Sequence, residues 1–126
     1  MNYFFCSINP KGKWDIFSFP ARNEDNFLAH SKMTPGDIMI LVVGLQDKNI
    51  ESGAYSILEC TSDLFKSEEY NGKIRNRINA KCLYHSGSKP FMTREEVSNF
   101  VHLPLRVPVI ATENLFELTN VLDKYI

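Results

Sequence analysis

Thr34-Pro35-Gly36-Asp37-Ile38-Met39-Ile40-Leu41-Val42-Val43 is the stretch on which the fold prediction depends. Proline presets φ at the second position of a turn, and glycine accepts a positive φ at the third, which is the pattern of a type II turn. An unbroken apolar run rich in β-branched residues follows this turn. Such a run predicts a strand that is buried on both faces, at the centre of a barrel or beneath a helix.

Shorter apolar and alternating segments predict further strands on both sides of this one. They cover residues 3–7, 54–60, 73–84 and 107–111. In residues 73–84 the apolar residues alternate with basic and polar ones, so one face of the strand should be buried and the other exposed. The predicted buried face consists of Ile74, Ile78, Ala80, Cys82 and Tyr84.

Short helices are predicted between and after the strands. Residues 26–32 are predicted to form one of them. Thr93 and Glu96 have the spacing of a capping box, which predicts another short helix that begins there. A terminal helix is predicted to begin at Ala111 or Thr112. Its buried stripe would consist of Leu115, Leu118, Leu122 and Tyr125 or Ile126, at spacings of three and four residues.

These elements predict an α+β fold. We expect a curved, barrel-like mixed sheet of about five or six strands, with short helices at its rim and a C-terminal helix. Residues 18–26 and 61–71 are expected to be irregular connections. The chain has 126 residues, and residues 1–126 suit a single domain, because domains typically contain ~100–150 residues.

The composition limits the partners that the chain can attract. Its net charge is −1, so any binding to a polyanion must come from a local patch rather than from a global field. The first residues lack the pattern of a signal peptide, and no apolar run approaches the roughly 20 residues of a membrane span. We therefore expect a cytoplasmic protein with no membrane association.

The residues with reactive side chains are scattered along the chain. Cys6, Cys60 and Cys82 lie in apolar segments, and their odd number indicates buried free thiols in a reducing compartment. A metal site shared with a histidine is the alternative. No motif of serine hydrolases, P-loop proteins, zinc peptidases or dinucleotide-binding enzymes is present. The sequence predicts no enzymatic activity, no bound metal and no cofactor.

A basic strand face is one of two features that suggest binding. Lys73, Arg75, Arg77 and Lys81 share one face of the strand predicted at 73–84, and no acidic residue lies between residues 70 and 94. Their repeat of about 6.6 Å is close to the roughly 7 Å between phosphates along an extended strand. These residues are therefore candidate phosphate contacts. The alternative is a solvated face that deters edge pairing between sheets.

An aromatic cluster after the first strand is the second feature. Trp14, Phe17 and Phe19 follow the polar residues Ser7 and Asn9. Aromatic faces bind bases by stacking, which contributes ~1–3 kcal/mol per base, and the two polar side chains could orient a base through hydrogen bonds. The alternative is that Trp14 and Phe17 belong to the hydrophobic core.

The order of several motifs resembles the EVE domain, a member of the PUA-like group and a relative of the YTH domain. The resemblance covers about residues 2–111. The motifs that carry it are Tyr3-Phe4-Phe5-Cys6-Ser7-Ile8-Asn9, Trp14-Asp15-Ile16, Lys32-Met33-Thr34-Pro35-Gly36-Asp37-Ile38-Met39-Ile40 and the segment from Ala54 to Phe65. Each motif is short, and their order is more specific than any one of them.

The resemblance implies a small pseudo-barrel that recognises a modified base in DNA or RNA, with the base flipped into an aromatic-lined pocket. It implies that Trp14 and Phe19 stack on the base. Ser7 and Asn9 would contact the base edge. The segment from Cys60 to Phe65 would close the other side of the pocket.

The leading functional prediction is therefore a non-catalytic nucleic-acid-binding module. The alternative is a protein-interaction or accessory domain of a defence or RNA-processing assembly, with Leu103, Leu105 and the terminal helix at a homodimer interface. A third hypothesis is an enzyme that acts on nucleobases, for which Asp15 and His30 would be the acid–base candidates.

Overall fold

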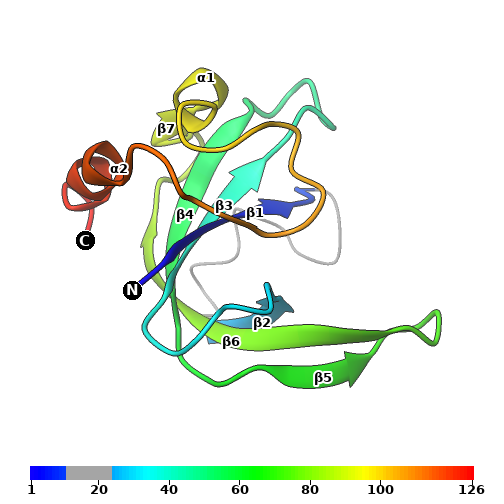
Figure 1. Ribbon diagram of the computed structural model, residues 1–126. Coiled ribbons are helices and arrows are strands. Elements are labelled where there is room, and N and C mark those ends of the chain that lie inside the picture. Colours follow the sequence, from blue (N-terminus) through cyan, green and yellow to red (C-terminus); the bar gives the residue numbers. More distant parts are fainter. Residues whose placement is uncertain (11–23) are drawn as a thin grey trace.

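The computed structural model describes residues 1–10 and 24–126, which form one mixed sheet with two short helices (Figure 1). The α+β class predicted from the sequence is confirmed. The strands are β1 (Tyr3–Ile8), β2 (Glu24–Leu28), β3 (Ile38–Val43), β4 (Gly53–Cys60), β5 (Phe65–Glu68), β6 (Ile74–His85), β7 (Met92–Thr93) and β8 (Val109–Ile110), and the helices are α1 (Arg94–Val97) and α2 (Leu115–Leu122).

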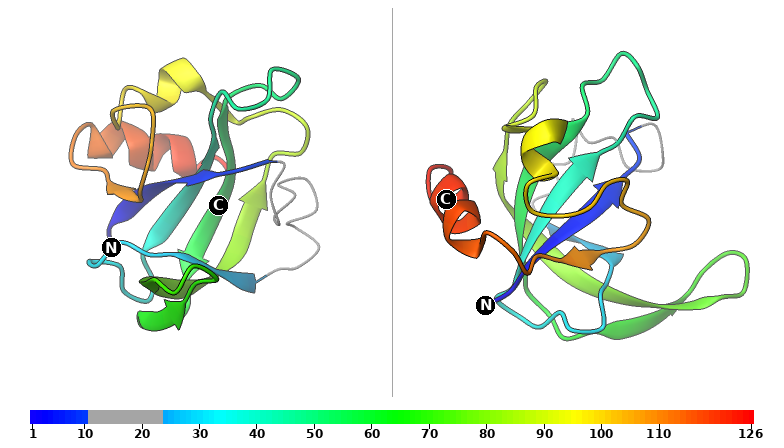
Figure 2. Two further views of the ribbon diagram at one scale, coloured as in Figure 1. Left: turned by 90° about the vertical axis from the view of Figure 1, so that its right-hand side faces the viewer. Right: turned by 45° about the horizontal axis from the view of Figure 1, so that its top comes forward.

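The strands pair in the order β2-β6-β4-β3-β1-β8, with β5 added to β6 and β7 added to β4. The β1–β3 pair is parallel, and the other pairs are antiparallel. The two helices lie on one side of the sheet, and the β5–β6 hairpin projects away from them as an arm (Figures 1 and 2). No helix of the described residues is long and apolar enough to cross a membrane.

The predicted turn and the strand that follows it are both present. Gly36 has a φ of 92°, and the Asp37 N–H donates to the Thr34 carbonyl at 3.1 Å, as a type II turn requires. All residues of β3 are buried, and β3 lies between β1 and β4 in the sheet. The apolar run is therefore a central strand that is covered on both faces.

The carboxylate of Asp37 joins this turn to the start of the chain. It is only 3% exposed, and it accepts hydrogen bonds from the Asn2 N–H at 2.9 Å, the Thr34 N–H at 2.9 Å and the Thr34 hydroxyl at 3.2 Å. The backbone of the turn also exchanges two hydrogen bonds of 2.8 Å with Cys60 at the end of β4. One buried side chain therefore aligns β1 with β3 at the place where β4 ends.

The sheet has a separate hydrophobic core on each face. Side chains that alternate along a strand point to opposite faces, so Phe4 and Phe5 belong to different cores. The core on the Phe5 side lies beneath the helices and includes Leu118 and Leu122 of α2. The core on the Phe4 side combines β1, β3, β4 and β6 with Phe27 of β2.

The sheet is curved but open, which corrects the expectation of a barrel-like closure. β1 and β2 lie far apart in the strand order, yet both contribute to the core on the Phe4 side. No hydrogen-bonded ladder joins β2 to β1 or β8 among residues 1–10 and 24–126. A seam without backbone pairing among these residues therefore separates β2 from β1 and β8.

Two predicted connections are strands, and the predicted helix at 26–32 is absent. Phe27 pairs with Ile78 of β6 and packs into the core, which explains why residues 24–28 adopt the extended conformation of β2. Residues 65–68 form β5, because the long β6 provides a free edge beyond the core. β2 depends on β6 as a partner that is distant in sequence, and β5 is a short polar strand of a local hairpin with β6, so local propensity revealed neither.

The face predicted for β6 is partly wrong. Ile57 of β4 pairs with Tyr84, whereas its neighbour Leu58 pairs with Cys82, so a β-bulge at Leu83 reverses the alternation. Cys82 packs on the Phe4 side, and Tyr84 packs on the helix side against Phe91 and Tyr125, at ring distances of 5.6 and 4.7 Å. Ile74, which was also predicted to be buried, is 68% exposed because it lies on the arm.

The helix α1 is capped as predicted, and α2 begins later than predicted. Thr93 and Glu96 form both hydrogen bonds of the capping box. α2 starts at Leu115, after Asn114 with a φ of 54°, and it buries Leu118 and Leu122. Leu115 and Ile126 are exposed. The last strand is limited to Val109–Ile110, because only these residues pair with β1.

The buried Ser56 of β4 and the partly buried His85 of β6 form a pair. The Ser56 hydroxyl lies 2.7 Å from Nδ1 of His85, and Nε2 of the same ring is buried without a hydrogen-bond partner among the described residues. Burial lowers the pKa of His85 below its ordinary value of 6.5. A protonated ring would place an unpaired charge beside the core, so the folded state favours the neutral ring.

Replacing Asp37 with Asn should destabilise the fold strongly. The amide keeps the shape of the carboxylate, but it cannot accept from the two backbone N–H groups and the hydroxyl together. We expect a loss of about 2–4 kcal/mol in the free energy of unfolding, measured by urea denaturation. Asp63→Asn, on an exposed carboxylate, is the matched control and should change stability by less than about 0.5 kcal/mol. Equal effects of the two variants would contradict this role for Asp37.

Stability should decrease as the pH falls from 7.5 to about 5.5, because the unfolded state takes up a proton on His85 before the folded state does. Above the unfolded pKa both states are neutral, and the group contributes no pH dependence. Urea denaturation at several pH values measures this slope. His85→Asn should flatten it, and the exposed His102→Asn is the control. A slope that is unchanged in His85→Asn would disprove the assignment.

Candidate functional site

The seam between the two edges of the sheet contains a pocket of about 250 Å³. We call it the seam pocket. It lies at the end of β1, opposite β2 and beneath the segment that leads into β8. Its lining consists of Cys6, Ser7, Ile8, Asn9, Phe27, Leu28, Leu41, Arg77, Arg106, Val107 and Pro108.

The seam pocket has apolar walls and polar groups on several sides. Phe27, Leu41 and Pro108 contribute apolar surface, and the polar residues Ser7 and Asn9 belong to the lining at the end of β1. Ser7 also lines a second cavity with Val42 on the helix side of the sheet. No carboxylate is present among the described residues that line it. Its volume is below the ~300–1,000 Å³ of most small-molecule sites, so it suits one flat ring system better than a large ligand.

Ser7 and Asn9 line the same pocket, but the segment from Cys60 to Phe65, which was predicted to close its other side, does not line it. Cys60 is buried in the core on the Phe4 side, and Phe65 lies on the arm next to Arg77, so neither lines the seam pocket. The wall is formed instead by β2 and by residues 106–108. Cys60 and Phe65 are therefore not retained as base contacts.

Phe27 and Arg106 are lining residues that the sequence analysis did not identify. Phe27 was assigned to a helix, and a strand prediction for residues 24–28 would have been needed to place it opposite Ser7. Arg106 lies between two short apolar residues and has no motif around it. Trp14 and Phe19, the predicted stacking residues, lie outside the described residues, as do Phe17 and Asp15. Their roles stay predictions.

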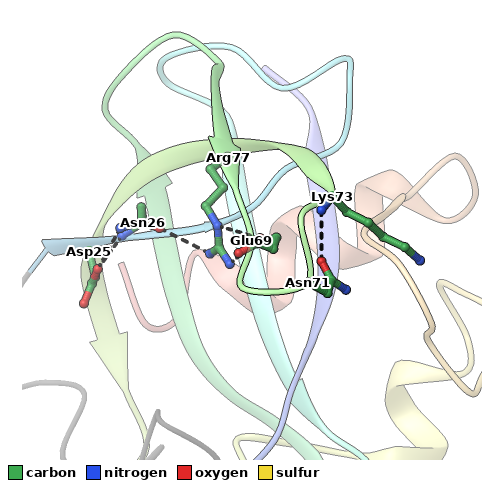
Figure 3. Close-up of polar contacts among 6 residues, drawn as sticks. All are labelled: Asp25, Asn26, Glu69, Asn71, Lys73 and Arg77. Carbon is green, nitrogen blue, oxygen red and sulfur yellow. Dashed lines mark hydrogen bonds and ion pairs between the residues drawn. The ribbon is translucent and has the colours of Figure 1, made fainter.

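The four residues of the predicted basic strand face have different surroundings, and acidic residues from neighbouring segments lie beside two of them. Arg77 donates to Oε1 of Glu69 from Nη2 at 2.9 Å and from Nε at 3.2 Å, and its Nη1 donates to Asn26 at 3.2 Å (Figure 3). The guanidinium therefore links the tip of the arm to β2. Arg77 is primarily a structural residue, although it also lines the seam pocket.

Lys81 is also surrounded by acidic residues. In the register of the sheet it lies between Glu24 of β2 and Glu59 of β4. Side chains at directly opposed positions lie on the same face, about 4.5–5.5 Å apart at Cβ. The acid-free stretch in the sequence is therefore not an acid-free surface, and Lys81 is not retained as a phosphate contact.

Lys73 and Arg75 lie in a different environment, on the arm. With His30, Asn76, Val107 and Pro108 they line a hollow of about 600 Å³, completed by Leu28, Ala29 and Ile74. We call it the basic hollow. No carboxylate lines it among the described residues, and it shares Leu28, Val107 and Pro108 with the seam pocket. The two cavities are therefore neighbours.

The buried reactive groups are poorly placed for catalysis. Burial raises the pKa of the Cys6 thiol, with a further contribution from Cys60. Burial, together with the charges of Asp37 and Glu59, raises the pKa of Cys60 to about 12. Both thiols are therefore protonated near neutral pH and are weak nucleophiles. Ser56 has a histidine beside it but is 0% exposed, so a substrate cannot reach its hydroxyl.

Arg77→Gln should loosen the arm, whereas Arg75→Gln should not. Losing the bonds to Glu69 and Asn26 is expected to lower the free energy of unfolding by about 0.5–1 kcal/mol, because the pair is partly exposed. Amide hydrogen exchange should rise at Glu69 and Gly72, which close the turn of the arm. Slower or equal exchange in Arg77→Gln, relative to Arg75→Gln, would contradict a structural role for Arg77.

Comparisons with known proteins support the fold. No protein-family model matches the chain, and no curated protein matches it significantly. The crystal structure of protein Atu2648 from Agrobacterium tumefaciens is similar, with a TM-score of 0.63 and 12% sequence identity. The match covers 98% of this chain and 92% of that one. At this identity, the likeness shows a shared fold along nearly the whole chain.

Proposed function

We propose that this chain is a non-catalytic nucleic-acid-binding module that holds one base in the seam pocket. One observation carries the proposal: Ser7 and Asn9, both predicted as base contacts, line one apolar pocket that has two arginines and no carboxylate among the described residues. The arrangement suits a flat, polar-edged ring that is attached to an anion. In this proposal the fold is a PUA-like pseudo-barrel of the EVE type, and its open seam is the binding site.

The chemistry of the pocket matches what a flipped base requires. Removing a base from its stack costs a few kcal/mol, which stacking and hydrogen bonds to the base edge must offset. Phe27, Leu28 and Pro108 provide apolar contact, and Ser7 and Asn9 are the polar residues of the lining that would supply donors and acceptors. Trp14 and Phe19 would add aromatic stacking. A modified base in DNA or RNA is the ligand that the resemblance to EVE domains favours.

The poor placement of Cys60 and Ser56 for catalysis supports a binding role over an enzymatic one. The Cys60 thiol has a pKa of about 12, and Ser56 is inaccessible. The alternative of a protein-interaction domain has its own support, since Phe116 of α2 is 77% exposed. Leu103 and Leu105, which were suggested for a dimer interface, pack partly against the core beneath the helices.

Trp14 is the only tryptophan, so the tryptophan fluorescence of the protein comes from the residue that is predicted to stack on the base. We expect quenching by at least one member of a panel of modified and unmodified oligonucleotides at low salt. Ser7→Ala combined with Asn9→Ala should weaken binding about thirtyfold or more, because each lost edge contact is worth ~1–3 kcal/mol. Ser88→Ala, on an exposed turn that lines neither cavity, is the control.

Two results would count against this function. Constant fluorescence with every oligonucleotide, supported by unchanged anisotropy of the labelled strands, would remove nucleic-acid binding and favour the protein-interaction alternative. Quenching that is equally strong in the Ser7/Asn9 variant and in Ser88→Ala would place the bound strand elsewhere on the surface. Light scattering on the same samples separates a homodimer from a monomer.

A further inference from the structure

The basic hollow differs from every other part of the predicted basic face in its charge environment. A second hollow, on the other side of the arm, is lined by Arg75 and Arg77 but also by Asp25, Glu68 and Glu69. The basic hollow is lined by Lys73, Arg75 and His30, and by no carboxylate among the described residues. An anion would therefore be attracted to the basic hollow and repelled by the carboxylates of the other.

The two cations of the basic hollow are available to a ligand. Unlike Arg77, Lys73 and Arg75 form no ion pair within residues 1–10 and 24–126. Figure 3 shows the Lys73 side chain directed away from the Glu69 carboxylate, and the Lys73 N–H is held by Asn71 at 3.1 Å. Arg75 also borders the second hollow with Glu68 and Glu69, but it forms an ion pair with neither of them in the described part of the chain. The turn of the arm therefore presents Lys73 without a competing acid.

His30 adds a hydrogen-bond donor to the basic hollow. Its Nδ1 accepts a hydrogen bond from the Lys32 N–H at 3.1 Å. In a neutral imidazole the other nitrogen, Nε2, then carries the proton. The ring lies against Phe4 with 5.3 Å between the ring centres, which holds its orientation. His30 therefore offers an N–H group, which suits a phosphate oxygen, rather than an acceptor.

The position of the basic hollow relates it to the base pocket. Leu28, Val107 and Pro108 form a common wall, with the seam pocket on one side and the basic hollow on the other. A nucleotide strand that places one base in the seam pocket would cross this apolar wall with its sugar–phosphate backbone. The adjacent phosphate would then reach Lys73 and Arg75.

We propose that the basic hollow binds the phosphodiester next to the base held in the seam pocket. The ligand is then a strand of at least two nucleotides, unpaired at the base that is read, rather than a free base or nucleoside. The proposal rests on the proposed function of the seam pocket. It assigns phosphate binding to Lys73 and Arg75 with His30, and it excludes Lys81 and the structural Arg77.

The salt dependence of binding to a labelled single-stranded oligonucleotide tests this assignment. Each neutralised phosphate of a single strand steepens the slope of log K against log salt by ~0.7. Lys73→Gln combined with Arg75→Gln should reduce the slope by about 0.7–1.4 and weaken binding at low salt about tenfold or more. Lys66→Gln combined with Lys81→Gln removes the same charge from exposed positions outside the basic hollow and should leave both quantities near those of the wild type.

Nuclear magnetic resonance of the His30 ring provides a second, independent readout. A dinucleoside monophosphate should shift the His30 signals of the wild-type protein, and the corresponding nucleoside should not. The shift should be lost in the Lys73/Arg75 variant. Inorganic phosphate at the same ionic strength should shift them less than the dinucleotide does, because it lacks the base that fills the seam pocket.

The outcomes separate this proposal from the one on which it rests. If Ser7/Asn9 replacement weakens binding but the Lys73/Arg75 variant keeps the wild-type salt slope, the base pocket stands and the phosphate assignment is wrong. If the wild-type protein binds no oligonucleotide at any salt concentration, both proposals fail. If inorganic phosphate shifts His30 as strongly as the dinucleotide, the hollow is a free-phosphate site and the strand proposal is overturned.

Discussion

The buried carboxylate of Asp37 is the interaction on which the rest of the structure depends. Its oxygens accept from the backbone of Asn2 and from both donors of Thr34, while the adjacent backbone bonds to Cys60. These contacts align the starts of β1 and β3 with the end of β4. A parallel strand pair has no tight turn to determine its register, so a side chain performs that task here. Alternation along β1 then places Phe4 and Phe5 in different cores.

The candidate site lies where the curved sheet does not close, between β2 and the strands β1 and β8. β1 and β2 approach each other closely enough to share a core, but side chains rather than a hydrogen-bonded ladder fill the space between them. Ser7 and Asn9, at the end of β1, line the pocket in this seam. Val107 and Pro108, in the segment before β8, line it as well. A fully closed barrel would have buried these backbone groups in a ladder and left no pocket at this place.

Charge on this surface is controlled by the strands that flank β6 rather than by β6 itself. Glu69, from the end of the arm, neutralises Arg77, and Glu24 and Glu59 flank Lys81 from both neighbouring strands. Lys73 precedes β6 and Arg75 lies at its start, and neither forms an ion pair among the described residues. Both line the basic hollow, which shares Leu28, Val107 and Pro108 with the seam pocket, so the electropositive surface and the apolar pocket are adjacent.

The amino-acid sequence by itself determined the elements whose signals are local. The turn before Ile38, the buried strand that follows it and the capping box of α1 each depend on neighbouring residues, and each is present. Only the tertiary structure decided β2 and the β-bulge at Leu83, because these depend on strand pairs across long sequence separations. The hairpin partner β5 is local but polar, so it lacks the apolar alternation that would predict a strand. The same reason applies to the site: Ser7 and Asn9 were recognisable as polar residues at a strand end, whereas the opposing wall and the acidic partners of Arg77 and Lys81 come from strands that are distant in sequence and adjacent only in the folded sheet.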